Sequence, residues 1–224
     1  VPIKQEGLTV SVSKISNIPP FELNVCGDIS SAAFFMVAAT LLKGSDLVLK
    51  NIGINKTRTG VIEVLKKMGA DVTVLNVKEV CGEPVGDIHI RGTGALKGTI
   101  INGDIIPRLI DEIPILAVAA SFAEGETIID DAEELRVKES DRIKAMVTEL
   151  QKLNVNVTET PKGMIIKGCN KTKFAKIKTY GDHRIAMAFY IFGICSPTGL
   201  DLDETESISV SFPNFFDKMK EVTF

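Results

Sequence analysis

The spacing of apolar residues along the chain predicts two kinds of helix separated by short strands. Residues 30–42 and 185–194 form apolar stretches without a charged side chain, a pattern typical of a helix that is buried on every side. Residues 140–154 instead place their apolar side chains at the spacing of one helix face, with charged side chains on the other. We therefore expect buried helices at the centre, with strands and amphipathic helices around them.

The order of these elements repeats along the chain. Residues 8–13 (LTVSVS) and 21–25 (FELNV) alternate like strands, and a buried helix, a strand, an amphipathic helix over 58–70 and another strand follow. Residues 87–92 (DIHIRG) and 164–168 (MIIKG) are expected to open two further runs of the same order. We predict an α/β (α+β) chain of three repeated βαβαββ-like units, with bounds near 8–78, 87–160 and 164–224.

The units are expected to form a single domain over residues 21–224. The third unit is predicted to be incomplete, because the chain reaches Phe224 before its closing strands can form. Residues 1–20 are expected to be the end of a preceding domain, or a linker with a first strand. The opening VPIKQEG has no initiator Met, which suggests a fragment or a processed form.

Composition narrows the classes of partner. A net charge of −3 with 45% hydrophobic residues favours a packed core and argues against a basic surface for nucleic acid. The longest uninterrupted apolar run, residues 185–195, is shorter than the roughly 18 residues that a membrane-spanning helix needs. Neither a nucleic-acid nor a membrane partner is therefore expected.

The cysteines and histidines give little support to a disulfide framework or a metal site. Cys26, Cys81, Cys169 and Cys195 are widely scattered, which favours reduced thiols and a cytoplasmic location. The chain has two histidines and no Cys-x-x-Cys pair, so a zinc site is not predicted.

An Asp stands at the start of each segment that is expected to be a buried helix: Asp28, Asp111 and Asp182. An Asp side chain at such a place accepts hydrogen bonds from free N–H groups of the first turn, and we predict this capping role for Asp28 and Asp182. Asp111 belongs to the acid pair of RLIDEIPIL, just before Pro114. A partly desolvated carboxylate beside a helix N-terminus suits proton transfer.

Cations gather where helices are predicted to begin, although the positive end of the helix dipole repels them. In LRVKESDRIKAM, Arg136, Lys138 and Arg142 surround Glu139, and Lys138 and Arg142 are expected on one helix face. Arg184 occupies the first turn of a buried helix. Cations combined with helix N-termini bind phosphate or carboxylate groups, so the sequence predicts a site for an anionic small molecule.

Two of these cations also have a simpler interpretation. Arg184 could form an ion pair with Asp182, and Arg142 could pair with Glu139 on a solvated helix surface, where such a pair contributes only a few tenths of a kcal/mol. Recurrence favours the anion site, because Arg58 also precedes the second helix of the first unit.

The motifs LRVKESDRI, GDHRIAMAF and PRLIDEIP resemble the C-terminal half of the 5-enolpyruvylshikimate-3-phosphate (EPSP) synthase family, as do GDISSAAFF and SFPNFF. The resemblance implies two domains of three βαβαββ units each, with the active site between them. It also implies transfer of the enolpyruvyl group of phosphoenolpyruvate to the 5-hydroxyl of shikimate 3-phosphate, without a metal or organic cofactor. This chain would then be a half-site with little turnover alone, because the N-terminal domain of the same enzyme supplies further residues.

The resemblance also implies roles for five residues. Asp111 resembles the base that contacts the shikimate hydroxyls, and Lys138 resembles a residue that binds shikimate 3-phosphate near the reacting oxygen. Glu139 resembles the proton donor to the methylene carbon. Arg142 and Arg184 resemble the pair that binds phosphoenolpyruvate, for which the fork of an Arg is well suited.

Two positions depart from the family pattern. Val210 stands before Ser211 where some members have a Lys that contacts phosphoenolpyruvate, so no contact is assigned there. Glu134 stands where some members have an Asn that touches shikimate 3-phosphate, which leaves its role undecided. The alternatives are the sister enolpyruvyl transferase that acts on UDP-N-acetylglucosamine, an RNA 3′-phosphate cyclase-like module, and a non-catalytic anion-binding module.

Overall fold

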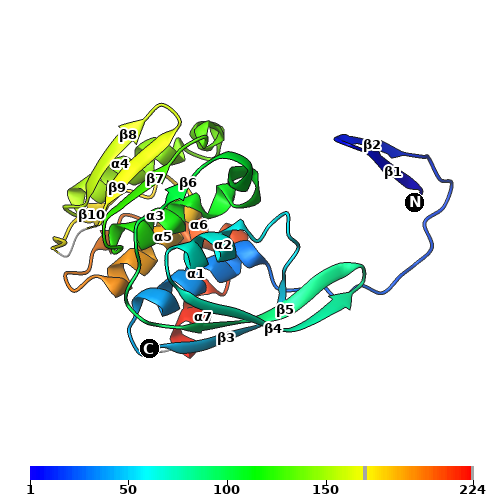
Figure 1. Cartoon of the computed structure of the whole chain (residues 1–224), viewed down its shortest axis with the longest axis horizontal. Helices are drawn as coiled ribbons and strands as arrows, with labels where there is room; N and C mark the ends of the chain where they lie inside the picture. The colour runs from blue at the N-terminus through cyan, green and yellow to red at the C-terminus, as the bar shows by residue number, and fades with distance from the viewer. Residues whose placement is uncertain (169–170, 223–224) are drawn as a thin grey trace.

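The computed structural model describes residues 1–168 and 171–222, so Cys169 and the predicted end at Phe224 lie outside the described residues. Figure 1 shows the arrangement of the elements. The helices are α1 (Ile29–Leu41), α2 (Gly60–Lys67), α3 (Ile113–Ser121), α4 (Arg142–Lys152), α5 (His183–Cys195), α6 (Glu206–Ser211) and α7 (Phe215–Glu221), with short 3-10 helices η1 (Gly103–Arg108), η2 (Ile110–Glu112) and η3 (Glu133–Val137). The strands are β1 (Ile3–Glu6), β2 (Thr9–Val12), β3 (Asp46–Gly53), β4 (Asp71–Val80), β5 (Glu83–Arg91), β6 (Ile100–Ile101), β7 (Glu126–Ile129), β8 (Asn156–Thr160), β9 (Gly163–Lys167), β10 (Lys176–Ile177) and β11 (Asp201–Leu202).

The core is built around α1, α3 and α5, which contact one another. All residues of α3 are buried, and α1 and α5 are buried along most of their length. A helix that is apolar on every side is stable only when neighbours cover it, so the predicted buried helices are confirmed. No helix within residues 1–168 and 171–222 is long and apolar enough to cross a membrane.

Sheets and amphipathic helices surround this centre. One sheet has the order β3-β5-β4, a second has β6-β7-β9-β8, and β10 pairs with β11. The α1 helix contacts β3 and β5, α3 contacts β9, and α5 contacts β11. The amphipathic helices α2 and α4 bury their apolar faces and contact β4 and β8. This mixed α/β arrangement is the one that the sequence predicts.

Two strands that the sequence places at the start of a unit pair with strands of the preceding unit. β5 contains residues that were expected to open the second unit, yet it lies between β3 and β4. The reason is a tight turn: Cys81 and Gly82 have φ of 53° and 82°, so the chain folds straight back from β4 into β5. In the same way β9 pairs with β7 and β8. The three-unit division stays a prediction. These pairings favour placing β5 at the end of the first unit and β9 at the end of the second.

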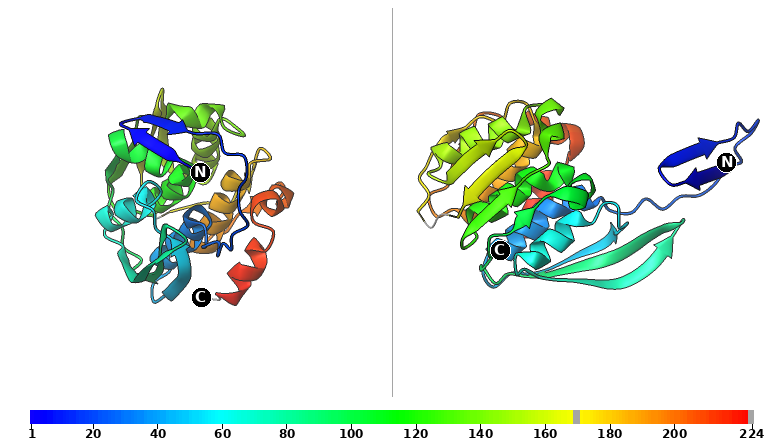
Figure 2. Two further views of the ribbon diagram at one scale, coloured as in Figure 1. Left: turned by 90° about the vertical axis from the view of Figure 1, so that its right-hand side faces the viewer. Right: turned by 45° about the horizontal axis from the view of Figure 1, so that its top comes forward.

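The expected strands near the N-terminus are only partly present. Residues 21–25 form no strand and are exposed, because a strand needs a neighbour for its backbone hydrogen bonds. β2 pairs with β1 in a hairpin that stands away from the main body (Figure 1 and Figure 2). At the other end, two short helices, α6 and α7, end the described part of the chain.

Candidate functional site

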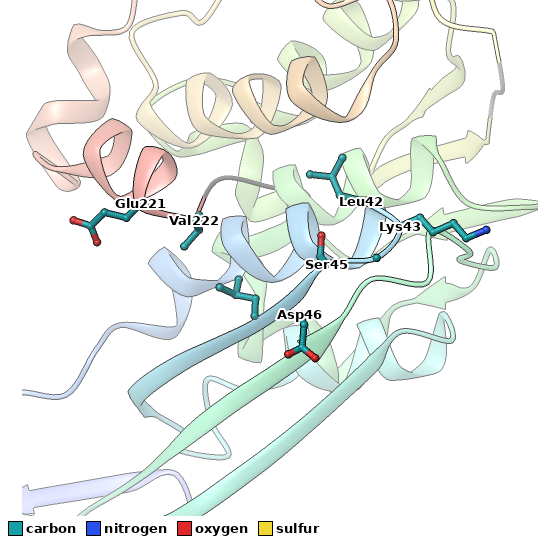
Figure 3. Close-up of a pocket in the computed structure, with 8 residues that line it drawn as sticks. Leu42, Lys43, Ser45, Asp46, Glu221 and Val222 are labelled. Atoms are coloured by element: carbon teal, nitrogen blue, oxygen red, sulfur yellow. The ribbon is translucent and has the colours of Figure 1, made fainter.

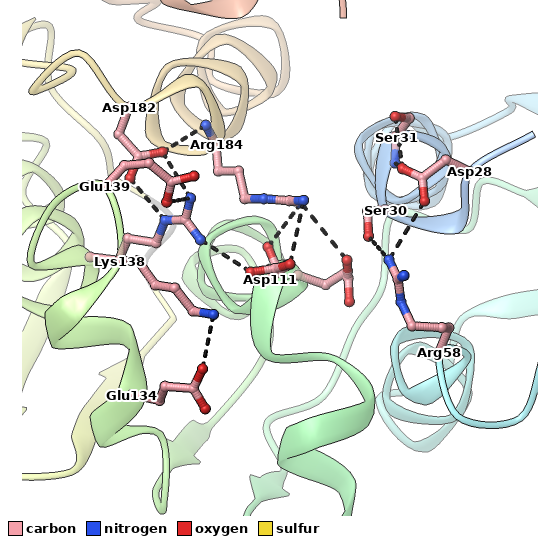
Figure 4. Close-up of polar contacts among 12 residues, drawn as sticks. Asp28, Ser30, Ser31, Arg58, Asp111, Glu134, Lys138, Glu139, Asp182 and Arg184 are labelled. Carbon is pink, nitrogen blue, oxygen red and sulfur yellow. Dashed lines mark hydrogen bonds and ion pairs between the residues drawn. The ribbon is translucent and has the colours of Figure 1, made fainter. Parts of the chain in front are cut away.

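The N-terminal ends of α3, α4 and α5 meet in one cluster of charged side chains (Figure 4). Asp111 lies in η2 directly before α3, Arg142 is the first residue of α4, and Arg184 lies in the first turn of α5. These residues and Glu139 form one network of ion pairs, so the structure brings together four of the five predicted site residues. The fifth, Lys138, lies beside the network and contacts a different carboxylate.

Arg142 is the centre of this network and is 1% exposed. Its Nε donates to Asp182 Oδ2 at 2.8 Å, and its two terminal nitrogens donate to Asp111 Oδ1 at 3.2 Å and to Glu139 Oε2 at 2.6 Å. The planar fork of an Arg suits several carboxylates at once, which a Lys could not hold in the same way. Arg142 therefore makes four hydrogen bonds within the protein, including a second one to Asp182, from its five N–H donors.

Asp182 caps α5, as predicted, and also carries the buried charge that faces Arg142. Its Oδ1 accepts from the backbone N–H of Arg184 at 2.9 Å, and its Oδ2 also accepts from Ser140 Oγ at 2.9 Å. Burial alone would raise the pKa of Asp182, but the hydrogen bond and charge of Arg142 outweigh it, so that the pKa lies below its ordinary value. The Asp182 carboxylate is therefore ionised throughout the neutral range.

Arg184 is held much more loosely than Arg142. Its NH1 donates to the backbone oxygen of Asp111 at 3.3 Å, while its ion pairs with Asp111 Oδ2 and Glu112 Oε1 are 3.6 and 3.9 Å long. Within the described residues its side chain pairs with these two acids rather than with Asp182, so the simpler interpretation of Arg184 is wrong. A guanidinium with long contacts and a 17% exposed side chain has donors available for a ligand.

Asp111 does not cap its helix, whereas Asp28 and Asp182 cap theirs. No side-chain hydrogen bond caps α3, whose N-cap residue is Glu112. Asp28 does cap α1, because its Oδ2 accepts from the backbone N–H of Ser31 at 2.8 Å. The carboxylate of Asp111 is instead shared between Arg142 and Arg184, with a third of its side chain exposed. It is thus the one of the three helix-start acids that faces both arginines.

The expectation that Lys138 and Arg142 share a helix face is wrong. The α4 helix begins only at Arg142, because Asp141 is its N-cap and accepts from the backbone N–H of Lys144 at 3.0 Å. Lys138 has an extended backbone before the helix, and its Nζ forms an ion pair with Glu134 at 3.0 Å. Figure 4 shows the side chain of Lys138 directed toward Glu134.

Arg136 anchors the segment that carries Lys138 and Glu139. Its guanidinium donates to the backbone oxygens of Thr160 and Pro161 at 2.7 and 3.0 Å, and forms ion pairs with Asp141 and Glu159 at 3.0 and 2.8 Å. This one side chain ties the end of η3 to the β8–β9 hairpin and to the cap of α4. It is a structural cation, which its sequence position among the other cations did not reveal.

Sequence reasoning missed Glu112, the second acid of the pair in RLIDEIPIL. Glu112 is 2% exposed, and its Oε1 has no hydrogen-bond partner among the described residues. Burial raises the pKa of Glu112, and this outweighs the opposite effects of the Ser30 hydroxyl and of Arg184. The apolar residues on both sides of the acid pair were a signal of burial, but they do not tell which acid points inward.

Arg58 brings the start of α1 to the same region. Its NH2 donates to Ser30 Oγ at 2.8 Å and lies 3.6 Å from Asp28 Oδ1. Ser30 also contacts the Glu112 carboxyl, and the charges of Arg184 and Arg58 both act to lower the pKa of that buried acid. Half of the Arg58 side chain is exposed, so it adds positive charge to the surface beside the cluster.

A pocket at the opposite end of α1 contains none of the predicted site residues. It encloses about 650 Å³ and is shown in Figure 3, where Lys43, Asp46 and Glu221 project from its walls. These mixed charges do not form an anion site, and α1 would separate them from Asp28 by about 20 Å at the usual helix rise. The charged cluster, rather than this pocket, has the chemistry that the sequence predicts.

A family model described as EPSP synthase (3-phosphoshikimate 1-carboxyvinyltransferase) matches residues 1–219 of the chain. A 3-phosphoshikimate 1-carboxyvinyltransferase from Geotalea daltonii is 51% identical over 90% of this chain and 47% of its own length. One from Desulforamulus reducens is 47% identical over 98% of this chain and 51% of its own length. The chain spans about half the length of the curated relatives that it matches.

Two solved structures of enolpyruvyl transferases are also similar to this chain. The EPSP synthase from Acinetobacter baumannii has a TM-score of 0.93 and 43% identity, and the match covers 99% of this chain and 51% of that one. The enolpyruvyl transferase NikO from Streptomyces tendae has a TM-score of 0.67 and 16% identity, covering 87% of this chain and 42% of that one. The second likeness concerns the fold alone.

Proposed function

The chain belongs to the EPSP synthase family, and from this premise we propose that it forms one side of an active site that transfers the enolpyruvyl group of phosphoenolpyruvate to the 5-hydroxyl of shikimate 3-phosphate. The observation that carries the proposal is the network in which Arg142 and Arg184 share the carboxylate of Asp111. Guanidinium groups bind carboxylate and phosphate, and carboxylates move protons, so the cluster has both capacities that this reaction needs.

The proposed roles follow the steps of the reaction. Asp111 accepts the proton of the shikimate hydroxyl while the hydroxyl oxygen bonds to the central carbon of phosphoenolpyruvate. Glu139 gives a proton to the methylene carbon. The tetrahedral intermediate then returns a proton from the new methyl group to the Glu139 carboxylate and expels phosphate, which takes the proton held by Asp111, so that the double bond is restored. Lys138 binds shikimate 3-phosphate near the reacting oxygen, and the two arginines hold phosphoenolpyruvate. Holding both substrates together removes much of the entropic barrier.

The contacts of Arg142 add a step before the chemistry. Its guanidinium makes four hydrogen bonds to Asp111, Asp182 and Glu139, so an anion that binds it through two N–H groups at once has to displace one of these carboxylates. Asp182 is fully buried, whereas half of the Glu139 side chain is exposed. Glu139 is thus the group that can move. In the proposed sequence, phosphoenolpyruvate replaces Glu139 on Arg142 and thereby frees the proton donor.

The proposed partner is the N-terminal domain of the same enzyme, and residues 1–20 are proposed to belong to it. The β1–β2 hairpin supports this assignment. One of its faces carries Ile3, Val10 and Val12, and all three are more than half exposed. An isolated two-stranded hairpin is only marginally stable in water, so this apolar face fits a packed neighbour. A cytoplasmic location also belongs to the proposal, in keeping with free thiols at Cys26 and Cys195.

Binding and turnover can be tested separately. Isothermal titration of the chain itself with shikimate 3-phosphate and phosphoenolpyruvate tests the half-site. For turnover, this chain replaces the matching half of the Geotalea daltonii relative, and phosphate release is measured with both substrates. We expect the chimera to release phosphate, and Lys138→Met or Arg142→Met to abolish the release. Arg91→Met is the control, because the Arg91 side chain is 60% exposed in β5. A folded chimera that binds neither substrate contradicts the proposal.

A further inference from the structure

The turn that leads into α5 has an unusual backbone conformation. Tyr180 has φ of 61° and the next residue, Gly181, has φ of 67°. Glycine adopts this left-handed region readily, but a bulky aromatic residue rarely does, so the conformation persists only where surrounding contacts enforce it. Asp182 and Arg184 follow at once, which places this disfavoured turn directly before the charged cluster.

A buried carboxylate outside the cluster holds the turn in place. Glu149 is fully buried in α4, and its Oε1 accepts from the Tyr180 hydroxyl at 2.9 Å. Its Oε2 accepts from the backbone N–H of Lys178 at 3.0 Å, and Lys152 Nζ donates to both oxygens at 2.8 and 2.7 Å. A buried charge needs such partners. The proposed chemistry does not use Glu149, so its contacts with the turn call for an explanation.

The α4 helix therefore holds this turn at two points. Arg142, at the first position of α4, contacts Asp182, and Glu149, about two helical turns later on the same face, contacts Tyr180. On the other side, Thr179 is buried and donates its backbone N–H to Asp203 Oδ1 at 2.8 Å. With its ends and its middle fixed, the turn has one orientation, and that orientation sets the direction in which Arg184 leaves the helix.

The Tyr180 hydroxyl is a stable donor in this arrangement. Burial, followed by the hydrogen bond to Glu149, raises the pKa of Tyr180 to about 12, so the phenol keeps its proton at neutral pH. The ammonium group of Lys178 lies 5.1 Å from the centroid of the Tyr180 ring, a distance that suits a cation–π contact. Both contacts act on the left-handed residue itself.

We propose that Glu149 and Tyr180 are positioning residues: their contact fixes the turn at residues 178–182 and thereby aims Arg184 at a bound anion. The identity of that anion, phosphoenolpyruvate, rests on the proposed function. The positional part concerns only contacts within this chain. Neither residue contacts the charged cluster directly, so their effect on ligand binding passes through Arg184.

The positional part is tested without a ligand by NMR of the Arg184 Nε–H signal. Tyr180→Phe removes the hydroxyl and keeps the ring. Glu149→Gln removes the negative charge of the carboxylate that accepts the hydrogen bond from this hydroxyl. The matched control is Tyr190→Phe, because Tyr190 packs edge-on against Phe215 and Phe216 at ring distances of 5.4 and 5.2 Å, away from this turn. We expect the Arg184 signal to shift or broaden in the first two variants and to stay unchanged in the control. An unchanged Arg184 signal in a folded Tyr180→Phe variant overturns the proposal.

The ligand part is tested by titration with phosphoenolpyruvate and with shikimate 3-phosphate. We expect Tyr180→Phe to weaken phosphoenolpyruvate binding about tenfold, as small displacements of a binding group do, and to change shikimate 3-phosphate binding less than twofold. A purely structural role would weaken the binding of both ligands alike, and this result would overturn the proposal. The loss in the double variant Tyr180→Phe/Glu149→Gln should be smaller than the sum of the two single losses, since both changes weaken the contact between the same two side chains. If neither the unsubstituted chain nor the chimera binds either ligand, the proposed function fails, and the NMR signal alone decides the positioning role.

Discussion

Arg142 Nε lies 2.8 Å from Asp182 Oδ2, and both side chains are almost completely buried. The pair joins the first residue of α4 to the cap of α5, where two helix dipoles place positive potential side by side. An Arg at this point would be unfavourable alone, but Asp182, Asp111 and Glu139 surround it with negative charge. Arg142 is thus first of all the counter-charge of three carboxylates, and a two-pronged contact with a ligand would require one of them to leave.

Asp182→Asn is expected to destabilise the chain by about 3–5 kcal/mol, because it leaves the charge of Arg142 buried without its closest partner. Asn caps helices as well as Asp does, so the loss does not come from the cap of α5. Asp28→Asn is the matched control, since Asp28 caps α1 but pairs with Arg58 only at 3.6 Å on the surface. Urea unfolding measures the loss of unfolding free energy in both variants. Equal losses in the two variants would contradict a special role for the buried pair.

The same pair predicts a dependence of stability on pH. Because the pKa of folded Asp182 is lowered, its contribution is fully present above the unfolded pKa of an Asp, about 3.9, and is lost as the pH falls through the folded pKa. The difference in unfolding free energy between the wild-type chain and Asp182→Asn should therefore shrink between pH 5 and pH 2, a range chosen around that pKa. Unfolding curves at these pH values check this, and a constant difference would argue against it.

Much of the fold could be predicted because burial leaves a direct trace in the sequence. A helix such as α3, with no charged residue from Ile113 to Ser121, has to lie in the core. Strand pairing was less accessible: nothing in the apolar pattern says that β5 lies between β3 and β4, and only the turn at Cys81 and Gly82 indicates it. Pairing depends on contacts between distant segments, which periodicity does not encode.

The candidate site was predictable in its residue types but not in its geometry. The charges of Lys138, Glu139 and Arg142 indicated an anion site, yet the start of α4 depends on whether Asp141 or an earlier residue caps it. The side chain of Arg136 binds this cap residue, Asp141, and at the same time binds the distant β8–β9 hairpin. Local sequence preferences do not contain such contacts.

Arg136→Lys is expected to destabilise the chain by about 1–3 kcal/mol, because a Lys ammonium cannot reach the carboxylates and the backbone oxygens that the guanidinium fork holds together. The control is Arg91→Lys, since Arg91 is 60% exposed and its ion pairs are 3.8 Å long. Urea unfolding gives the loss, and hydrogen exchange of the Lys144 amide reports on the cap of α4. Unchanged exchange in Arg136→Lys would show that Asp141 caps the helix without help.

Glu112→Gln is expected to stabilise the chain at neutral pH by more than the few tenths of a kcal/mol that a surface substitution changes. The pKa of folded Glu112 is raised, so the folded state binds its proton more tightly, and stability falls as the pH rises from the unfolded pKa through the folded one. Gln cannot ionise and avoids this loss. Unfolding free energies at pH 4 and pH 8 should therefore differ less in the variant than in the wild-type chain. Glu79→Gln, on an exposed part of β4, is the control and should leave the pH dependence as it is.

Glu139→Gln separates binding from turnover. Glu139 occupies Arg142 NH2 at 2.6 Å, and a neutral Gln holds that nitrogen less tightly, so an anion displaces it more easily. Because half of the Glu139 side chain is exposed, the gain is modest: we expect inorganic phosphate and phosphoenolpyruvate to bind about two- to fivefold more tightly, equal to about 0.4–1 kcal/mol.

The chimera that carries Glu139→Gln should nevertheless release no phosphate, since Gln cannot donate the proton that the methylene carbon needs. Glu124→Gln is the control, because it makes the same change in net charge on an exposed residue beyond the far end of α3. It should alter neither anion binding nor phosphate release. Titration calorimetry and a phosphate-release assay measure the two effects. Weaker anion binding in Glu139→Gln would mean that Glu139 helps to hold the ligand instead of competing with it, and retained turnover would assign the proton to another group.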